Sequence, residues 1–330
     1  LLILNKNHIM AKPLVVGVDI GGTNTVFGVV DARGQIRSQN SIKTGNYSTA
    51  EEYVAVLAPE LNRIIEQAGG RDQFQGIGIG APNGNYYKGT IEDAANLSWG
   101  DKKVVPFVDM LQEATGIACV LTNDANAAAI GEMTYGVAKG MKNFIMITLG
   151  TGVGSGIVIN GQLVYGHDGF AGELGHVIVR RRNGRLCSCG RRGCLEAYAS
   201  ASGIVQTARE MTQRGKKETL FSSYNMDTLS SKDVHDLALR GDEVAIDVFR
   251  YTGHILGEAF ADYVAFSTPE AIILFGGPSK AGHFLLDPIR EAMENSMLSI
   301  YKGNTKLLLS QLPESDAAIL GASALGWEVG

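Results

Sequence analysis

The chain has 330 residues, of which 45% are hydrophobic and 19% charged, and its formal net charge is −5. A length of about 100–200 residues per domain predicts two domains, and this composition is that of a globular enzyme whose core needs no disulfides. The acidic balance argues against nucleic acid as a partner, and no run reaches the roughly 18 apolar residues of a membrane span. We interpret residues 1–12 as an extension and not a signal peptide, and we expect a cytoplasmic protein.

The first half of the chain alternates strands and helices. β-Branched runs on either side of Gly21 and Gly22 predict a strand, a tight turn and a second strand over 14–30. Apolar residues at helical spacing predict a helix over about 49–68, with Ser48 and Glu51 as its capping box. The other elements expected here are a strand over 75–80, a loop over 81–85, a helix between Pro106 and Gly116, a strand over 117–122, and a helix that Asn123 or Asp124 caps.

The second half repeats the opening pattern, because residues 143–164 also form an apolar strand, a Gly/Thr turn and a second strand. The two copies lie too far apart for a solenoid repeat, so they predict a duplicated domain in which each hairpin presents glycines to one cleft. Later elements are expected as helices near 198–213, 231–240 and 242–266, a strand over 270–276, a helix after Gly277, a strand over 306–312 and a helix near 315–328.

Strands that alternate with helices indicate the α/β class. We place the domain boundary near 123–126. One domain then comprises residues 13–123 with 313–330, because the last helix is expected to cross back, and a larger domain comprises 124–312.

The turn in DIGGTNT (19–25) has the chemistry of a phosphate site. Its glycines let backbone N–H groups point inward, Thr23 and Thr25 add hydroxyls, and Asp19 can hold Mg²⁺ directly or through water. The alternative is a plain hairpin turn. LGTGVGSG (149–156) favours the phosphate interpretation, because two facing hairpins around one triphosphate explain both loops. Neither is a Walker A motif, and the second runs into a strand and not a helix, unlike a dinucleotide fingerprint.

Asp124 lies in TNDANAAA (122–129), where a strand meets a helix N-terminus that favours its charged form. It is either a helix cap or a general base that accepts the proton of a hydroxyl during phosphoryl transfer, and both roles are possible at once. Asn123 would hold a neighbouring hydroxyl.

Three cysteines and one histidine form the strongest cluster in the sequence. Cys187, Cys189 and Cys194 fall in CSCGRRGCLE, and His176 precedes them in AGELGHV. Three thiols and one imidazole complete a tetrahedral zinc set, and four protein ligands make such a site structural. Free thiols are the alternative, whereas an odd number of clustered cysteines disfavours a disulfide framework.

The same loops carry two carboxylates. If zinc holds His176 through one ring nitrogen, the other nitrogen is left for a partner, and Glu173 and Glu196 are fixed nearby. We interpret the three side chains as a clamp for sugar hydroxyls. The alternative is that both glutamates are surface charges, although Glu173 lies between small and apolar residues.

The order DIGGTN, AANLSW, LTNDANAAA, LGTGVGSG, AGELGH and CSCGRRGCLE resembles the ROK family of repressors and sugar kinases over about 14–328. The resemblance implies the actin-like ATPase (sugar kinase/Hsp70) fold, with duplicated domains around a central cleft. It implies that Asp124 is the catalytic base, and that zinc binds His176, Cys187, Cys189 and Cys194. Sugar-binding residues would be Asn83, Asn96, Asn123, Asp124, Glu173, His176 and Glu196. ATP with Mg²⁺ would bind at Asp19, Gly21, Gly22, Thr23, Asn24, Gly150, Thr151, Gly152, Gly276 and Gly277.

Within the family, the sequence is most similar to glucokinases, which implies phosphorylation of a hexose 6-hydroxyl by ATP and a homodimer or larger homo-oligomer. The alternatives are a kinase for another hexose such as N-acetylmannosamine, or a regulator that senses sugar without catalysis. Repressors of the family carry a helix-turn-helix domain ahead of the DIGGT segment. The short stretch here favours an enzyme. The loop APNGN (81–85) departs from the family pattern.

Overall fold

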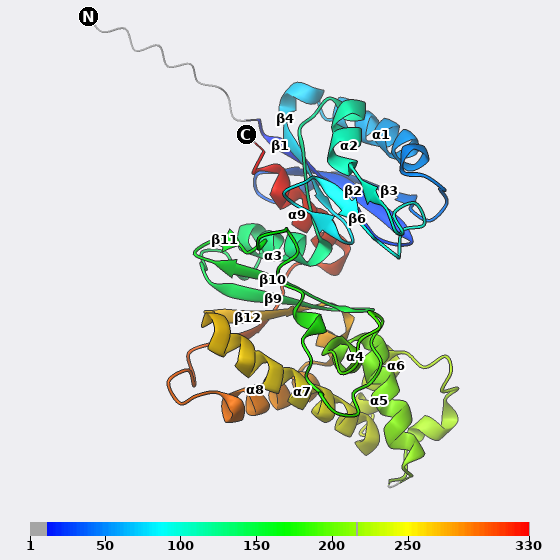
Figure 1. Cartoon of the computed structure of the whole chain (residues 1–330), viewed down its shortest axis with the longest axis vertical. Coiled ribbons are helices and arrows are strands. Elements are labelled where there is room, and N and C mark those ends of the chain that lie inside the picture. The colour runs from blue at the N-terminus through cyan, green and yellow to red at the C-terminus, as the bar shows by residue number, and fades with distance from the viewer. Residues whose placement is uncertain (1–11, 216, 330) are drawn as a thin grey trace, which may run out of the picture. The chain divides into compact units, whose positions relative to one another are not determined.

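The computed structural model describes residues 12–215 and 217–329. Apart from Lys12, the extension expected over residues 1–12 lies outside the described residues. The chain divides into two compact units, one formed by Leu1–Tyr135 with Ser315–Gly330 and the other by Gly136–Glu314. Figure 1 shows the elements of each unit.

The first unit is built on a five-stranded sheet of order β3-β2-β1-β4-β8. The strands β1 (Leu14–Ile20), β4 (Phe74–Gly80) and β8 (Cys119–Thr122) are parallel, and β1 forms an antiparallel hairpin with β2 (Asn24–Asp31). The edge strand β3 (Ile36–Lys43) alternates half-buried and exposed residues, as expected of a strand with one solvated face. A small sheet adds β5 (Gly84–Asn85), β6 (Thr90–Glu92) and β7 (Val104–Val105).

Helices cover both faces of this sheet (Figure 1). The helices α1 (Ala50–Gln67) and α2 (Phe107–Thr115) bury their apolar sides against Val16, Val18 and Ile79. On the other face lie α3 (Asp124–Tyr135) and α9 (Glu314–Gly326). A Cβ atom at Gly78 would lie 1.9 Å from the Ala322 carbonyl oxygen, so α9 packs directly on the sheet. The last helix therefore crosses back to the first unit, as the sequence predicted.

Two sequence predictions differ from the structure in this unit. Helix α1 is present as expected, but its cap is Thr49, whose side chain accepts a hydrogen bond from the Glu52 N–H at 3.2 Å. The capping box expected from Ser48 and Glu51 is therefore wrong by one residue. The units also divide after α3 and not near 123–126, because α3 lies on the first sheet, where Ala127 approaches Gly80.

The second unit repeats the topology of the first, with strand order β11-β10-β9-β12-β13. β9 (Phe144–Leu149) and β10 (Val153–Ile159) form the antiparallel hairpin, β11 (Gln162–Leu163) continues it, and β12 (Ala271–Phe275) and β13 (Lys306–Leu309) add parallel strands. In both sheets the first strand pairs antiparallel with the second and parallel with the fourth. This shared order confirms the duplication expected from the two glycine hairpins.

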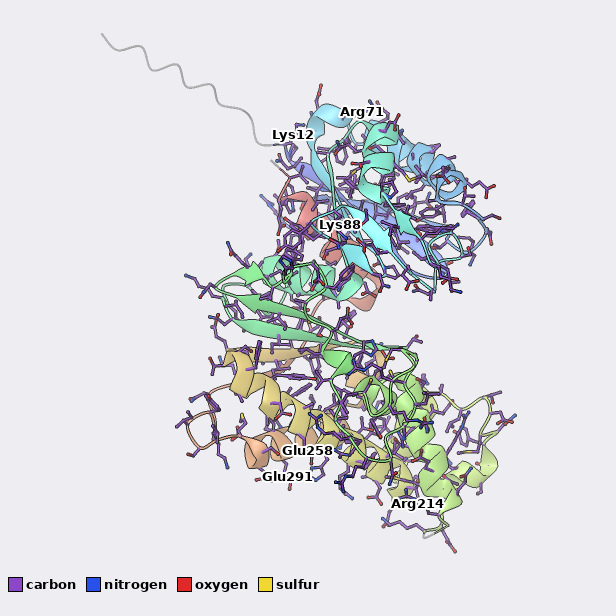
Figure 2. The ribbon with its side chains drawn as sticks, in the orientation of Figure 1. Lys12, Arg71, Lys88, Arg214, Glu258 and Glu291 are labelled. Carbon is purple, nitrogen blue, oxygen red and sulfur yellow. The ribbon has the colours of Figure 1, made fainter. Side chains whose placement is uncertain are left out.

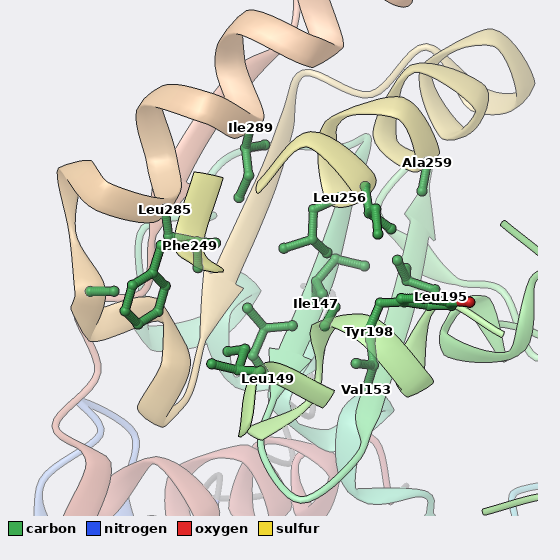
Figure 3. Packing of buried hydrophobic residues seen from close by; sticks show 14 of the residues in the cluster. Ile147, Leu149, Val153, Leu195, Tyr198, Phe249, Leu256, Ala259, Leu285 and Ile289 are labelled. Atoms are coloured by element: carbon green, nitrogen blue, oxygen red, sulfur yellow. The ribbon is translucent and has the colours of Figure 1, made fainter. Parts of the chain in front are cut away.

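One face of the second sheet carries the main helical core. Ile147, Leu149 and Val153 pack against Leu256 and Leu285 of the helices, and Figure 3 shows these side chains meeting in one cluster. The helices are α4 (Glu196–Ala199), α5 (Ala201–Gln213), α6 (Ser231–Leu239), α7 (Glu243–Ser267) and α8 (His283–Ser296). The short 3₁₀ turns of the chain are η1 (Arg71–Gln73), η2 (Leu174–His176), η3 (Leu220–Ser223) and η4 (Gly277–Ala281).

The surfaces of both units are charged. The side chains labelled in Figure 2 are all exposed: Lys12, Arg71 and Lys88 of the first unit and Arg214, Glu258 and Glu291 of the second. Among the described residues, none of the helices combines the length and apolar character that a bilayer crossing requires.

Candidate active site

The turn between β1 and β2 places polar groups at the carboxyl end of β1. The Gly21 N–H donates to the Asn24 carbonyl at 3.1 Å and closes the turn, while Thr23 and Asn24 are exposed. Thr25 behaves differently, because its side chain is buried and its Oγ1 bonds Thr44 Oγ1 at 2.8 Å and Tyr53 Oη at 2.6 Å. The expected phosphate contact of Thr25 is therefore wrong, since alternation along β2 turns this hydroxyl into the core.

Two carboxylates lie at the same edge of the first sheet. Asp19 is the penultimate residue of β1 and lies opposite Gly80 of β4, and Gly80 is opposite Thr122 of β8. A Cβ atom at Gly80 would lie 3.4 Å from Asp19 Oδ1 and 3.8 Å from Asp124 Cα. Ligands of open α/β sheets bind outside the carboxyl ends of the strands, which is where this pair lies.

The electrostatics of the pair are unusual for aspartates. Burial, followed by the charge of Asp124, raises the pKa of Asp19 to about 7. The loss of solvation also raises the pKa of Asp124, although hydrogen bonds from backbone N–H groups at Ala125 and at its own position act in the opposite direction. The Asp124 side chain nevertheless remains accessible to solvent. Perturbed carboxylates at a sheet edge are typical of a functional site, and two of them can hold a divalent cation or exchange a proton.

The structure separates the roles of Asn123 and Asp124. Asn123 Oδ1 accepts the Asn126 N–H at 2.7 Å, so Asn123 is the cap of α3. Asp124 is the first helical residue, and its Oδ1 accepts the adjacent Ala125 N–H at 2.8 Å. The capping function therefore does not account for Asp124.

The other predicted sugar-binding residues of this unit are Asn96 and Asn83. A Cβ atom at Gly22 would lie 3.1 Å from the Asn96 carbonyl oxygen and 3.7 Å from its Nδ2, so Asn96 lies over the glycine turn. Asn83 is exposed, has a left-handed φ of 51°, and donates from Nδ2 to the Asp93 carbonyl at 2.9 Å. The structure thus brings Asn96, Asp19 and the turn together, whereas the Asn83 amide nitrogen holds the backbone of its own loop.

The second unit has an equivalent glycine turn between β9 and β10. The Gly150 N–H donates to the Gly152 carbonyl at 2.9 Å, and Thr151 at the tip is exposed. β12 runs parallel to β9 and ends beside it, where Gly276 has a φ of 102° and a Cβ would meet the Leu149 carbonyl oxygen at 2.1 Å. Only glycine fits this backbone. Gly276 and the exposed Gly277 therefore lie at the base of the Gly150–Gly152 turn.

The four predicted metal ligands of this unit converge. The donor atoms of His176, Cys187, Cys189 and Cys194 all lie within 4.8 Å of one another. Cys187 Sγ is 3.7 Å from His176 Nδ1, and Cys189 Sγ is 3.7 Å from Cys194 Sγ. A tetrahedron with Zn–S bonds of about 2.3 Å would separate its sulfur atoms by about 3.8 Å. The donor set and its spacing therefore fit zinc.

The loop that carries the cysteines is held by a buried arginine that sequence reasoning missed. Arg185 stacks on Tyr198, with its guanidinium carbon 4.7 Å from the ring centroid, and bonds Glu210 through Nε at 3.0 Å and Nη2 at 2.8 Å. The side chain of Arg185 is only 8% exposed, so this pair fixes the base of the loop on α5. The run of arginines in the loop gives no signal that distinguishes this one.

Two predicted clamp carboxylates lie on this framework. Glu173 is exposed and directly precedes the short helix that ends at His176. Glu196 begins α4, where Oε1 accepts the Ser188 hydroxyl at 2.5 Å and Oε2 accepts the Val153 N–H at 3.1 Å. His176 turns Nδ1 toward the cysteines, which leaves Nε2 as its other polar atom. Sequence reasoning missed Ser188, although its position between Cys187 and Cys189 is a signal that it lies near the cluster.

The duplicated sheets, each opened by a glycine hairpin, define the actin-like ATPase fold. Residues 15–328 match the sequence model of the ROK family. The chain is 37% identical over 323 residues to a glucokinase of Halalkalibacterium halodurans, covering 97% of this chain and 96% of that protein. It is 34% identical over 318 residues to a glucokinase of Thermotoga maritima, covering 96% and 98%. A solved ROK family glucokinase from Streptomyces griseus, in complex with glucose and AMPPNP, has a TM-score of 0.76 and 34% identity, covering 94% of this chain and 98% of that one.

The chain therefore belongs to the ROK family.

Proposed function

We propose that this protein is a glucokinase that transfers the γ-phosphoryl group of ATP to the 6-hydroxyl of glucose. The observation that carries the proposal is the accessible carboxylate of Asp124, which is free of the capping role and lies beside Asp19 at the sheet edge. The glucokinases of similar sequence, and the similar structure in complex with glucose and AMPPNP, support both substrates.

In the proposed reaction, Asp124 accepts the proton of the sugar hydroxyl while the oxygen attacks the γ-phosphorus and ADP leaves. A raised pKa suits this role, because a general base works best when its pKa lies near the operating pH. Asp19 would hold Mg²⁺, which neutralises charge on the phosphates, and the N–H groups of the turn at Gly21–Asn24 would bind phosphate oxygens. Asn96, which lies over that turn, would bind a sugar hydroxyl, as would Asn123 and Asn83.

The second unit carries further residues that would bind ATP and sugar. Gly150, Thr151 and Gly152 would contact phosphate through their backbone, and Gly276 and Gly277 would lie near the adenosine. Glu173, His176 and Glu196 would bind sugar hydroxyls. This division is supported by two turns of matching topology, each with accessible residues at its tip.

We further propose that His176, Cys187, Cys189 and Cys194 hold a structural zinc ion. Four protein ligands close the coordination sphere, so the metal would organise the loop and not take part in phosphoryl transfer. Metal analysis of the purified protein should give one zinc per chain, and Cys189→Ser should abolish it. Four freely titratable thiols in a metal-free, active protein would refute the zinc proposal.

The base is tested by Asp124→Asn. This change keeps the shape of the side chain but removes the proton acceptor, so kcat should fall by about 10²–10⁴. Glucose affinity, measured by calorimetry, should stay within a few-fold. Asp101→Asn is the matched control, an exposed aspartate of the same unit, and should leave kcat unchanged. A near-normal rate for Asp124→Asn would remove this residue from the mechanism.

The sugar itself is tested by measuring ADP release over a panel of hexoses and N-acetylhexosamines. The proposal requires the highest kcat/KM for glucose, and a higher value for N-acetylmannosamine would replace glucose as the substrate. Binding of glucose without any ATP turnover would instead favour a sugar-sensing regulator. The homo-oligomer and the cytoplasmic location expected from the sequence stay predictions.

A further inference from the structure

The Glu196 carboxylate joins two loops of the second unit that are distant in sequence. Its Oε1 accepts the hydroxyl of Ser188, which lies between two predicted zinc ligands, at 2.5 Å. Its Oε2 accepts the backbone N–H of Val153, the first residue after the Gly150–Gly152 turn, at 3.1 Å. One side chain therefore connects the cysteine loop to the turn proposed to bind phosphate.

The backbone on both sides of this connection is held by packing. Val153 and Leu195 are 4% and 0% exposed and belong to one core, in which Figure 3 shows them together with Tyr198. The Leu195 N–H donates to the Val177 carbonyl at 3.0 Å, and the Ala201 N–H donates to the Gly150 carbonyl at 2.8 Å. Because these anchors are fixed, the orientation of the Glu196 carboxylate depends on its own hydrogen bonds, which involve Ser188, Val153 and the Cys187 sulfur.

The Glu196 carboxylate lies in close contact with the Gly150–Gly152 turn. A Cβ atom at Gly152 would lie only 2.6 Å from Glu196 Oε2. Cys187 Sγ lies 3.4 Å from Oε1 on the other side. A carboxylate offers about four acceptor positions, so both bonds can persist while Glu196 also binds a sugar hydroxyl.

We propose that Ser188 is a positioning residue that acts through Glu196. Its hydroxyl keeps the Glu196 carboxylate hydrogen-bonded to the Val153 N–H, and this bond fixes the turn proposed to bind phosphate to the cysteine loop. The inference rests on the proposed binding of ATP at this turn. Without the Ser188 hydroxyl, Oε1 loses its oxygen donor. The Cys187 sulfur, 3.4 Å away, cannot replace it when Cys187 is a deprotonated zinc ligand. The carboxylate can then turn away from Val153, and the turn loses a charge-assisted hydrogen bond.

The test is Ser188→Ala, with Mg²⁺–AMPPNP affinity measured by calorimetry and zinc measured by metal analysis on the same samples. We expect about tenfold weaker nucleotide binding, as for one lost charge-assisted bond, with zinc retained at the wild-type level. Ser188→Thr keeps the hydroxyl and should restore affinity. Ser222→Ala is the control, an exposed serine of the same unit whose hydroxyl donates to the Thr219 carbonyl.

A second variant reaches the carboxylate from the other side. The methyl group of Gly152→Ala would displace Glu196 Oε2, so it should also weaken nucleotide binding. Because both changes break the same connection, the double variant with Ser188→Ala should bind about as weakly as Gly152→Ala alone. Fully additive losses would show that Ser188 and the turn are independent.

Three further results overturn the inference: affinity within twofold of wild type in Ser188→Ala, loss of zinc in parallel with loss of affinity, or failure of Ser188→Thr to restore binding. Failure of the proposed function is distinct, because the wild-type protein itself would then bind no Mg²⁺–AMPPNP.

Discussion

The pKa of Asp19 leads to a prediction about stability. A rise from the usual 3.8 to about 7 corresponds to roughly 4 kcal/mol against the ionised form, and we expect about half of this because the side chain is partly accessible to water. Between these two pH values only the unfolded chain loses the Asp19 proton. The contribution of Asp19 to the free energy of unfolding should therefore fall as the pH rises from 4 to 7. Above pH 7 the Asp19 contribution should be constant.

Asp19→Asn removes the titrating group and isolates its contribution. We expect the variant to gain about 2 kcal/mol relative to wild type between pH 4 and pH 8. Guanidinium unfolding followed by tryptophan fluorescence suits the test, because both tryptophans, Trp99 and Trp327, belong to the first unit. Parallel pH profiles for the two proteins would show that Asp19 has an ordinary pKa, and would refute the view that burial and Asp124 disfavour its charge.

Two further predictions concern the packing and capping of the first unit, and the same fluorescence assay reports both. Gly78→Ala should cost about 2–3 kcal/mol, because its Cβ would meet backbone atoms of α9 at 1.9 and 2.7 Å, whereas Gly45→Ala, with its nearest atom at 3.7 Å, should cost less than about 0.5 kcal/mol. Equal costs would contradict direct contact between α9 and β4. Thr49→Ala should cost about 1 kcal/mol and Ser48→Ala less than about 0.5 kcal/mol, and the reverse order would restore Ser48 as the cap.

The sequence was sufficient to predict the secondary structure because the elements carry strong local patterns. The two glycine hairpins and α1 are examples, since β-branched runs and helical spacing depend on the chain nearby. The cap of α1 was misplaced by one residue because Ser48 and Thr49 are both good caps. Only the backbone geometry, with Thr49 extended at φ −134°, distinguishes them.

The site was predicted in part, and the difference follows from the range of the interactions. The Cys/His set is recognisable because its chemistry is specific, and the four donor atoms do converge. Thr25 was misassigned because its partner Tyr53 is contributed by α1, and local spacing carries no information about that contact. The Ser188–Glu196–Val153 connection was missed for the same reason, since it joins the segment that carries the cysteines to a strand far away in the sequence.

The duplication also explains why the catalytic candidate occurs in only one copy. In each unit a helix follows the fifth strand of the sheet: α3 follows β8, and α9 follows β13. Helix α3 stays on its own sheet, so its first residue, Asp124, lies at the strand ends beside Asp19. Helix α9 instead leaves the second sheet and packs against α3, where a Cβ at Gly321 would meet the Ala127 carbonyl oxygen at 3.0 Å. At the second sheet, the glycine turn is bordered instead by Glu196, the first residue of α4, and by the cysteine loop. The two copies of one topology therefore place different side chains beside their glycine turns: Asp124 in the first unit and Glu196 in the second.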